Sequence, residues 1–344
     1  MFVYNPPTMR KLFFILVIFL SAAFLYLSFG ELESIIETIQ HGNLWFVLLA
    51  IILQFGWFVI SGLTYLSLYR LLGLDGSVYK FILLSASANF VNTIAPSAGM
   101  SGTAVFISDA YRNHHSPGKA TIASMLNLFL DYLAFLVVLT LGLIVLFRRN
   151  DLDPTEIAAS AVIFTIAAGL GSLLYLGSRS ADALGNALAK IARLVNRVVR
   201  PFIHRNYLSE ERAHEFAHEM STDLKSLPER PRSLVKPLLY AFANKTLMMC
   251  ILMASFLSFQ VPFTAGTIIG GFSIAYLFLI VSPTPSGIGI VEGIMPLALS
   301  SLRIPWSQAI IITLTYRGIT FWLPLGVGAI AFRMLHRKPE LAVK

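Results

Sequence analysis

The chain of 344 residues is 56% hydrophobic and only 13% charged, with a formal net charge of +8 and a mean hydropathy of +0.73. A soluble domain of this length depends on a charged surface, so the composition excludes that class and indicates an integral membrane protein. The basic residues lie mostly beside apolar runs, where membrane topology and anionic lipid head groups explain them, and we predict no nucleic-acid binding. The single cysteine, Cys250, excludes an intrachain disulfide.

Apolar runs long enough to cross the hydrocarbon predict six spanning helices. A helix rises 1.5 Å per residue and needs about 20 apolar residues to span. Runs of that kind cover 12–29, 44–69, 120–147, 157–177, 237–260 and 306–332. The first run follows two basic residues, as in a signal peptide, but it ends in only a poor cleavage pattern before "GELESIIE". We therefore interpret it as a retained helix.

Two further apolar segments, 81–110 and 266–301, are each interrupted by a Pro/Gly break. The two arms of each segment have about 15 residues and reach roughly 22 Å, too little to cross the membrane core alone. Each segment is therefore either one broken spanning helix or a re-entrant hairpin. Basic residues beside both ends of the first segment place those ends in the cytoplasm under the positive-inside rule, which favours a hairpin.

The same rule predicts that both termini are cytoplasmic and that the second hairpin enters from the exterior. The order span, span, hairpin, span then occurs twice, in opposite orientations. Spacings agree, because Pro96 precedes Pro117 by 21 residues and Pro283 precedes Pro305 by 22. The sequence thus predicts an all-α polytopic membrane protein in which six spans and two re-entrant Pro/Gly hairpins form an inverted repeat, as in many secondary transporters.

This organisation divides the chain into five parts. Residues 1–150 are the first transmembrane repeat with the cytoplasmic-side hairpin, and residues 151–178 are the first span of the second repeat. Residues 179–236 are a basic cytoplasmic amphipathic loop, residues 237–335 complete the second repeat with the exterior-side hairpin, and residues 336–344 are a basic cytoplasmic tail.

The hairpin tips are predicted to meet near the membrane midplane, where each shelters the other's non-helical backbone from lipid. Their glycines permit close backbone approach, and their prolines end the first arms. The second arms are expected to begin at Gly99 and Gly287, so that two helix N-termini face an anionic group such as a phosphate. The alternative is that both breaks are kinks in tightly packed helices.

Charged side chains also lie within the predicted spans. Asp131 and Arg317 each stand about 11 residues into a span, where a charge costs roughly 2.5–3.5 kcal/mol and should face the protein interior. Either these charges and Glu292 pair internally and lock the bundle, or at least one binds a lipid head group or carries a proton. The residues predicted to bind substrate are Asn92, Pro96, Gly99, Gly102, Asn127, Asp131, Pro283, Pro285, Gly287, Gly289, Glu292, Tyr316 and Arg317.

The loop contains "HEFAH", residues 214–218, which matches the H-E-x-x-H motif of zinc proteases. There, His214 and His218 would bind zinc while Glu215 served as general base. The motif lies in a polar string typical of a solvated helix face, and no recognisable third-ligand motif follows it. We therefore predict neither a metal nor another cofactor.

The segment before this motif predicts an interfacial helix. It places Leu184, Leu188, Ile191, Val195 and Val198 on one face, and basic side chains occupy much of the remainder. Such a helix is expected to lie on the anionic cytoplasmic leaflet, with a solvated connector as the alternative.

The motif "NTIAPSAGMSG" with Asp131 downstream, and the motif "SPTPSGIGIVEG" followed by "RIPWSQAIIITLTYRGITFWLPLGVG", resemble the flippase-like family to which the transmembrane domain of lysylphosphatidylglycerol synthase belongs. The resemblance covers most of the chain. It implies movement of a phospholipid or lipid-linked head group between leaflets of the cell (inner or plasma) membrane, without the lipid synthesis that a separate soluble domain performs in that family. The alternatives are a membrane-embedded enzyme, either a zinc protease or a lipid transferase, and a scaffold whose charges are structural.

Overall fold

The computed structural model describes residues 36–94, 101–148, 154–203, 209–225, 231–282 and 284–336, and every regular element in them is helical. Five helices there are long and apolar enough to cross a membrane. They are α2 (Leu44–Leu71), α5 (Pro117–Arg148), α6 (Pro154–Arg179), Arg232–Ser258 and Trp306–Leu335. These helices confirm the predicted membrane class and coincide with five of the six predicted spans. The remaining prediction, 12–29, lies outside the described residues.

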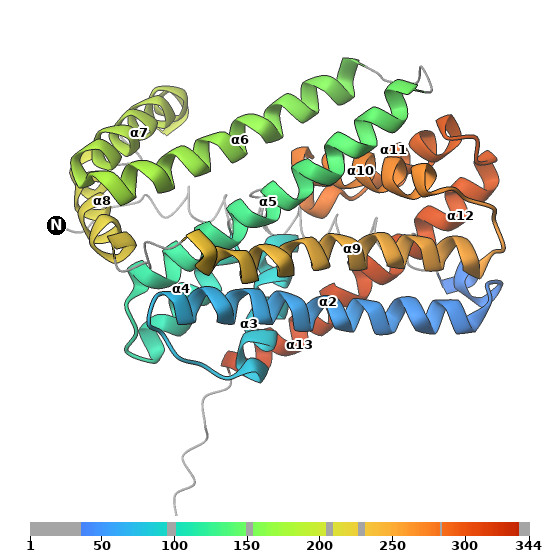
Figure 1. Cartoon of the computed structure of the whole chain (residues 1–344), viewed down its shortest axis with the longest axis horizontal. Helices are drawn as coiled ribbons and strands as arrows, with labels where there is room; N and C mark the ends of the chain where they lie inside the picture. Colours follow the sequence, from blue (N-terminus) through green and yellow to red (C-terminus); the bar gives the residue numbers. More distant parts are fainter. Residues whose placement is uncertain are drawn as a thin grey trace, which may run out of the picture.

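The long helices run lengthwise through the molecule, with α2 beside α9 (Val235–Ser258) (Figure 1). These two helices are antiparallel, because the Asn43 amide at the start of α2 donates to the Ser258 carbonyl at the end of α9, 2.8 Å away. Further along, the Asn244 side chain donates to the Ser61 hydroxyl at 3.1 Å. The contact joins the two halves of the chain along the centre of the bundle.

The first interrupted segment forms two short helices, α3 (Val78–Ile94) and α4 (Thr103–Arg112), which pack against each other. At their outer ends Lys80 forms an ion pair with Asp109 at 2.9 Å. At their inner ends the Gly102 amide donates to the side-chain oxygen of Asn92 at 2.6 Å. The chain therefore turns back on itself between the two helices.

The second interrupted segment forms α10 (Ala265–Val281), the short helical turn η2 (Pro285–Gly287) and α11 (Ile290–Ser301). α10 and α11 also pack against each other: a Cβ atom on Gly271 would lie 2.6 Å from Leu299, and one on Gly287 would lie 3.2 Å from the Cα of Leu279. The predicted start of the second arm at Gly287 is wrong. The helix begins three residues later, because Gly287 and Gly289 adopt φ angles of 72° and 76°, which a right-handed helix does not contain.

The second arm of the first segment also begins later than predicted, at Thr103 instead of Gly99. The backbone at 101–102 forms a turn held by the Asn92 side chain, which accepts from the Ser101 hydroxyl and the Gly102 amide. Gly102 is required here, because a Cβ atom would lie 2.8 Å from the Ala88 carbonyl oxygen.

The last span consists of α12 (Trp306–Arg317), a π-helical turn η3 (Gly318–Trp322) and α13 (Leu323–His336). The π-helical turn directly follows Arg317. Such turns interrupt the regular hydrogen-bond ladder and occur frequently at functional sites. The backbone is thus irregular directly after Arg317, which is buried in the middle of this span.

α7 (Ala181–Ile203) and α8 (Glu210–Lys225) gather at one end of the bundle (Figure 1), and a one-turn helix η1 (Pro231–Leu234) leads from this region into α9. The apolar face predicted for α7 is partly covered by α8. Leu184 is buried in a cluster with Met220 and Leu224 of α8, whereas Ile191 is 44% exposed. α8 folds back against α7 and covers part of that face. The side chains of Val195 and Val198 lie outside the described residues.

Candidate functional site

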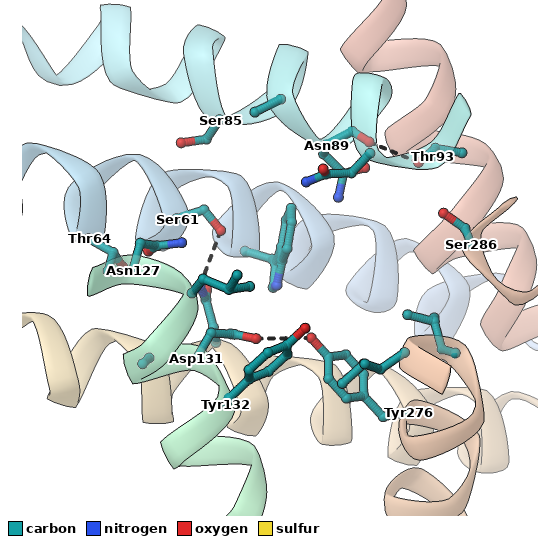
Figure 2. A pocket seen from close by; sticks show the side chains of 18 of the residues that line it. Ser61, Thr64, Ser85, Asn89, Thr93, Asn127, Asp131, Tyr132, Tyr276 and Ser286 are labelled. Carbon is teal, nitrogen blue, oxygen red and sulfur yellow. Dashed lines mark hydrogen bonds between the residues drawn. The ribbon is translucent and has the colours of Figure 1, made fainter. Parts of the chain in front are cut away.

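A cavity of about 230 Å³ lies among α2, α3, α5, α9, α10 and the break that follows α10 (Figure 2). Asp131 and Asn244 stand near the middle of their long helices, so the cavity lies deep within the apolar bundle. Non-helical backbone and polar groups at such depth are tolerated only where protein or water satisfies them. The polar side chains on the cavity wall are Ser61, Thr64, Tyr65, Ser85, Asn89, Asn92, Thr93, Asn127, Asp131, Tyr132, Asn244, Tyr276, Ser282, Thr284 and Ser286.

Asp131 is the charged residue on this wall, and it is held by Lys245 of α9. The Lys245 ammonium lies 2.7 Å from Oδ1 and 2.8 Å from Oδ2 of the carboxylate. It also lies 2.6 Å from the Tyr276 hydroxyl, which donates to Asp131 at 3.3 Å. The Lys245 side chain is 3% exposed and that of Asp131 is 26% exposed, so the carboxylate faces the cavity while the ammonium is buried behind it.

A second ion pair joins Arg317 of α12 to Glu292 of α11. The Arg317 guanidinium also donates to the Ser286 carbonyl at 3.1 Å and lies 4.6 Å from the centre of the Phe321 ring. Ser286 has a φ of 47°, a strained value for a residue other than glycine. Arg317 therefore holds the break between α10 and α11 in a conformation that the backbone does not favour.

Arg317 lines a smaller cavity of about 100 Å³ that adjoins the larger one. Asn89, Tyr276 and Ser286 are on the walls of both cavities. One oxygen of Glu292 is buried and has no hydrogen-bond partner among the described residues. The ion pair therefore leaves a carboxylate oxygen unsatisfied beside the polar interior.

The predicted site residues divide into three groups. Asn92, Asn127 and Asp131 line the larger cavity, Arg317 lines the smaller one, and Glu292 is the partner of Arg317. Gly102, Pro285, Gly287 and Gly289 shape the two breaks, and Tyr316 is buried without lining either cavity. Pro96, Gly99 and Pro283 lie outside the described residues.

The sequence prediction of substrate-binding residues omitted several residues of the cavity wall, notably Ser61, Tyr276 and Ser286. Tyr276 lies in a mostly apolar helix, whose other polar residues are Thr267 and Ser273, and it was not singled out from the sequence. Asn89 was easier to predict from the sequence. It precedes Asn92 and Thr93 by three and four residues, so the three side chains share one helical face.

The described residues contain no group of three or more His, Cys, Asp and Glu side chains arranged to hold a metal ion. His218 lies 3.8 Å from Asp182, and both side chains are largely exposed. His214 faces Gly185 of α7, where a Cβ atom would lie 2.9 Å from its Cε1 atom and closer still to its Nδ1 atom. The geometry thus gives the zinc-protease alternative no support.

A model of the family described as "Lysylphosphatidylglycerol synthase TM region" matches residues 12–328 of the chain. A UPF0104 membrane protein of Methanothermobacter thermautotrophicus is 26% identical over 331 residues, which cover 92% of this chain and 93% of that protein. A UPF0104 membrane protein of Methanocaldococcus jannaschii is 25% identical over 309 residues, which cover 89% of this chain and 90% of that protein.

Proposed function

Because the chain belongs to the family of the lysylphosphatidylglycerol synthase transmembrane region, we propose that it moves a lipid or a lipid-linked head group between the two leaflets of a cell membrane. The observation that carries the proposal is the polar cavity of about 230 Å³ in the middle of an apolar helical bundle. A polar head group loses its hydrogen bonds to water when it enters hydrocarbon, and a cavity lined by hydroxyl and amide groups replaces them.

In this proposal the two halves of the chain form an inverted repeat, and matched helix contacts support it. Gly142 of α5 faces Ser273 of α10, where a Cβ atom would lie 2.5 Å from the serine Cβ. Gly328 of α13 faces Ala86 of α3, where a Cβ atom would lie 2.6 Å from the alanine carbonyl. The two glycines are 186 residues apart and their two partners 187 residues apart, so the shifts that relate the two contacts differ by a single residue. Under these shifts α2 corresponds to α9, its own packing partner.

We further propose that the pairs α3–α4 and α10–α11 are re-entrant and enter from opposite faces of the membrane. The outer end of the first pair is connected to the start of α5 by the short segment 113–116. The outer end of the second pair adjoins the opposite end of α5, because a Cβ atom on Gly266 would lie 3.2 Å from Val145. The inner ends are close together: η2 packs on α3, and Thr93 and Ser286 line the same cavities (Figure 2).

The distribution of basic residues supports an orientation in which the end that carries α7 and α8 faces the cytoplasm. Loops and helix ends at that end of the bundle carry Arg70, Lys80, Arg112, Lys119 and Arg179. With a sixth span at 12–29, this orientation places both termini in the cytoplasm. Lys190 and Arg197 are exposed on α7 and would then lie near anionic lipid head groups.

The ion pairs suggest how the halves move. The Asp131–Lys245 pair and the Asn244–Ser61 hydrogen bond both join one half to the other, so a rocking motion must strain or break them. An anionic group that reached the smaller cavity would compete with Glu292 for Arg317. Substrate binding would thereby weaken the interaction of Arg317 with the break after α10. The conformation of the break would then depend on whether the site is occupied.

A transport assay with the protein in vesicles tests this function. The protein is reconstituted into phosphatidylcholine vesicles that contain phospholipids labelled on the acyl chain. Dithionite reduces only the labelled lipids of the outer leaflet, so a protein that moves lipids raises the reducible fraction above that of protein-free vesicles. An unchanged fraction for every labelled lipid would overturn the proposal. Mass spectrometry of the same lipids checks the transferase alternative, which predicts a change in their covalent structure, whereas transport predicts none.

A further inference from the structure

The charge balance of the larger cavity restricts the head groups that it suits. Asp131 is the only charged side chain on the described part of its wall, and Lys245 already neutralises it through both carboxylate oxygens. Residues 95–100 and Pro283, which adjoin wall residues in the sequence, add no charged side chain. A cationic head group would have to displace a buried ammonium, and an anionic group would meet the exposed carboxylate, so the wall favours an uncharged guest.

The remaining wall groups are those that bind hydroxyl groups. Asn89 and Asn127 bring side-chain amides, each of which carries both a donor and an acceptor. Asn92 brings its amide N–H groups, because its side-chain oxygen already accepts from Ser101 and Gly102. Ser286 adds a hydroxyl that can donate or accept, and Thr284 adds one that can accept, because it already donates to the Ile288 carbonyl. The Asp131 carboxylate, 26% exposed, retains lone pairs that can accept from a guest hydroxyl. A guest with many hydroxyl groups satisfies this mixture better than a guest with a single charged group.

The wall also carries aromatic side chains among its aliphatic ones. Trp57 and Tyr276 line both cavities. The flat face of an aromatic ring packs well against the axial C–H groups of a saturated six-membered polyol, and such rings dominate small-molecule pockets. The cavity volume of about 230 Å³ leaves room for one such ring.

We propose that the head group carried in the larger cavity is one uncharged polyol ring, a monosaccharide or an inositol, joined to its lipid through a phosphate. The inference rests on the proposed transport function. The phosphate would lie at the smaller cavity, where Arg317 is on the wall and where the shared residues Asn89 and Ser286 join the two spaces. The ring and the phosphate thus have separate, adjacent sites of matching chemistry.

The test compares acyl-labelled phosphatidylinositol, a labelled glucosyl phosphoprenol and labelled lysylphosphatidylglycerol in vesicles that contain the full-length protein. We expect at least one of the two polyol lipids to cross about tenfold faster than the aminoacyl lipid, since a mismatched head group leaves wall groups unpaired. Which polyol lipid is faster identifies the ring. Equal or faster movement of the aminoacyl lipid would overturn this inference and leave the transport function intact. Movement of none of the three would overturn both.

A charge variant gives an independent check. Asn89→Asp adds a second carboxylate to the wall and should slow the polyol lipid and speed the aminoacyl lipid. Gln40→Glu, at an exposed position outside the cavities, is the matched control and should change neither rate. An Asn89→Asp protein that keeps the wild-type preference would contradict the inference. Circular dichroism and size-exclusion chromatography confirm that each variant is folded.

Discussion

Lys245 of α9 holds the carboxylate of Asp131 of α5 through both oxygens, at 2.7 and 2.8 Å, although the two residues are 114 positions apart in the sequence. The pair removes the net charge from the centre of the bundle and joins the two halves of the chain. A charge that loses its partner at this depth is poorly stabilised. Removing one member of the pair should therefore destabilise the fold more than removing both.

We predict that Lys245→Met lowers the free energy of unfolding by about 3 kcal/mol, because it leaves Asp131 unpaired in the bundle. The value lies at the lower end of the range for buried pairs, since the carboxylate is 26% exposed. The double variant Lys245→Met with Asp131→Leu should recover most of the loss. Thermal unfolding in detergent measures both. A double variant as unstable as the single one would show that the charge pairing is not the cause.

Arg317→Leu should lower stability by about 3–5 kcal/mol, because Glu292 then remains buried without its partner. Arg333→Leu, at an exposed position of the same span, is the control and should stay within about 0.5 kcal/mol of the wild type. Thermal unfolding provides both values. A similar loss for Arg333→Leu would mean that any arginine in this span has the same effect.

The double variant Arg317→Leu with Glu292→Leu separates stability from transport. We expect it to unfold near the wild-type temperature, since no charge is left unpaired, and to move lipid at less than about a tenth of the wild-type rate, since the phosphate loses the arginine on the described wall of the smaller cavity. The vesicle assay measures that rate. If this variant moved lipid at the wild-type rate, the role of Arg317 would be structural only.

Gly287→Ala should destabilise the break after α10 by about 2–4 kcal/mol. The position has a φ of 72°, which costs alanine about 1–2 kcal/mol, and the new Cβ atom would lie 2.6 Å from Val291. Gly293→Ala is the control, because no atom lies within 4 Å of a Cβ there, and a helical alanine should be neutral or stabilising by up to about 1 kcal/mol. Equal unfolding temperatures for the two variants would contradict the role assigned to Gly287.

Hydropathy was sufficient to locate the five described spanning helices and the two helix pairs. The predicted hairpin segments 81–110 and 266–301 coincide closely with the helix pairs at 78–112 and 265–301. Clustered proline and glycine located the breaks for a local reason, since such clusters disfavour a continuous helix. The exact starts of the second arms were missed, because they depend on positive φ angles and on the cap from Asn92, which neither residue type nor spacing specifies.

The partners of the buried charges could not be predicted. Glu292 and Arg317 were expected to pair with Asp131 or with each other, and the structure pairs Asp131 with Lys245. That contact depends on the packing of α5 against α9, which the pattern of either helix alone does not determine. The π-helical turn after Arg317 and the folding of α8 onto α7 likewise arise from tertiary packing, without a periodic signal.

The proposed membrane topology makes a prediction for cysteine labelling, after Cys250, the single native cysteine, is replaced by alanine. Cysteines at Ser77 and Asn113, at the outer ends of α3 and α4, should react with an impermeant maleimide from the cytoplasmic face. Cysteines at Pro262 and Ser301, at the outer ends of α10 and α11, should react from the exterior. All four positions are exposed in the structure. Labelling of the two members of either pair from different faces would show that the segment spans the membrane.

The most direct measurement of the central claim is the accessibility of a cysteine at Asn89, a residue on the wall of both cavities, in the Cys250→Ala protein. If the cavity is a transport site that opens to each leaflet in turn, an impermeant thiosulfonate added to either face of the membrane should modify the whole population. A cysteine at Ser255, which is fully buried, should react from neither face. Modification of Asn89→Cys from one face only, or from neither, would contradict the account.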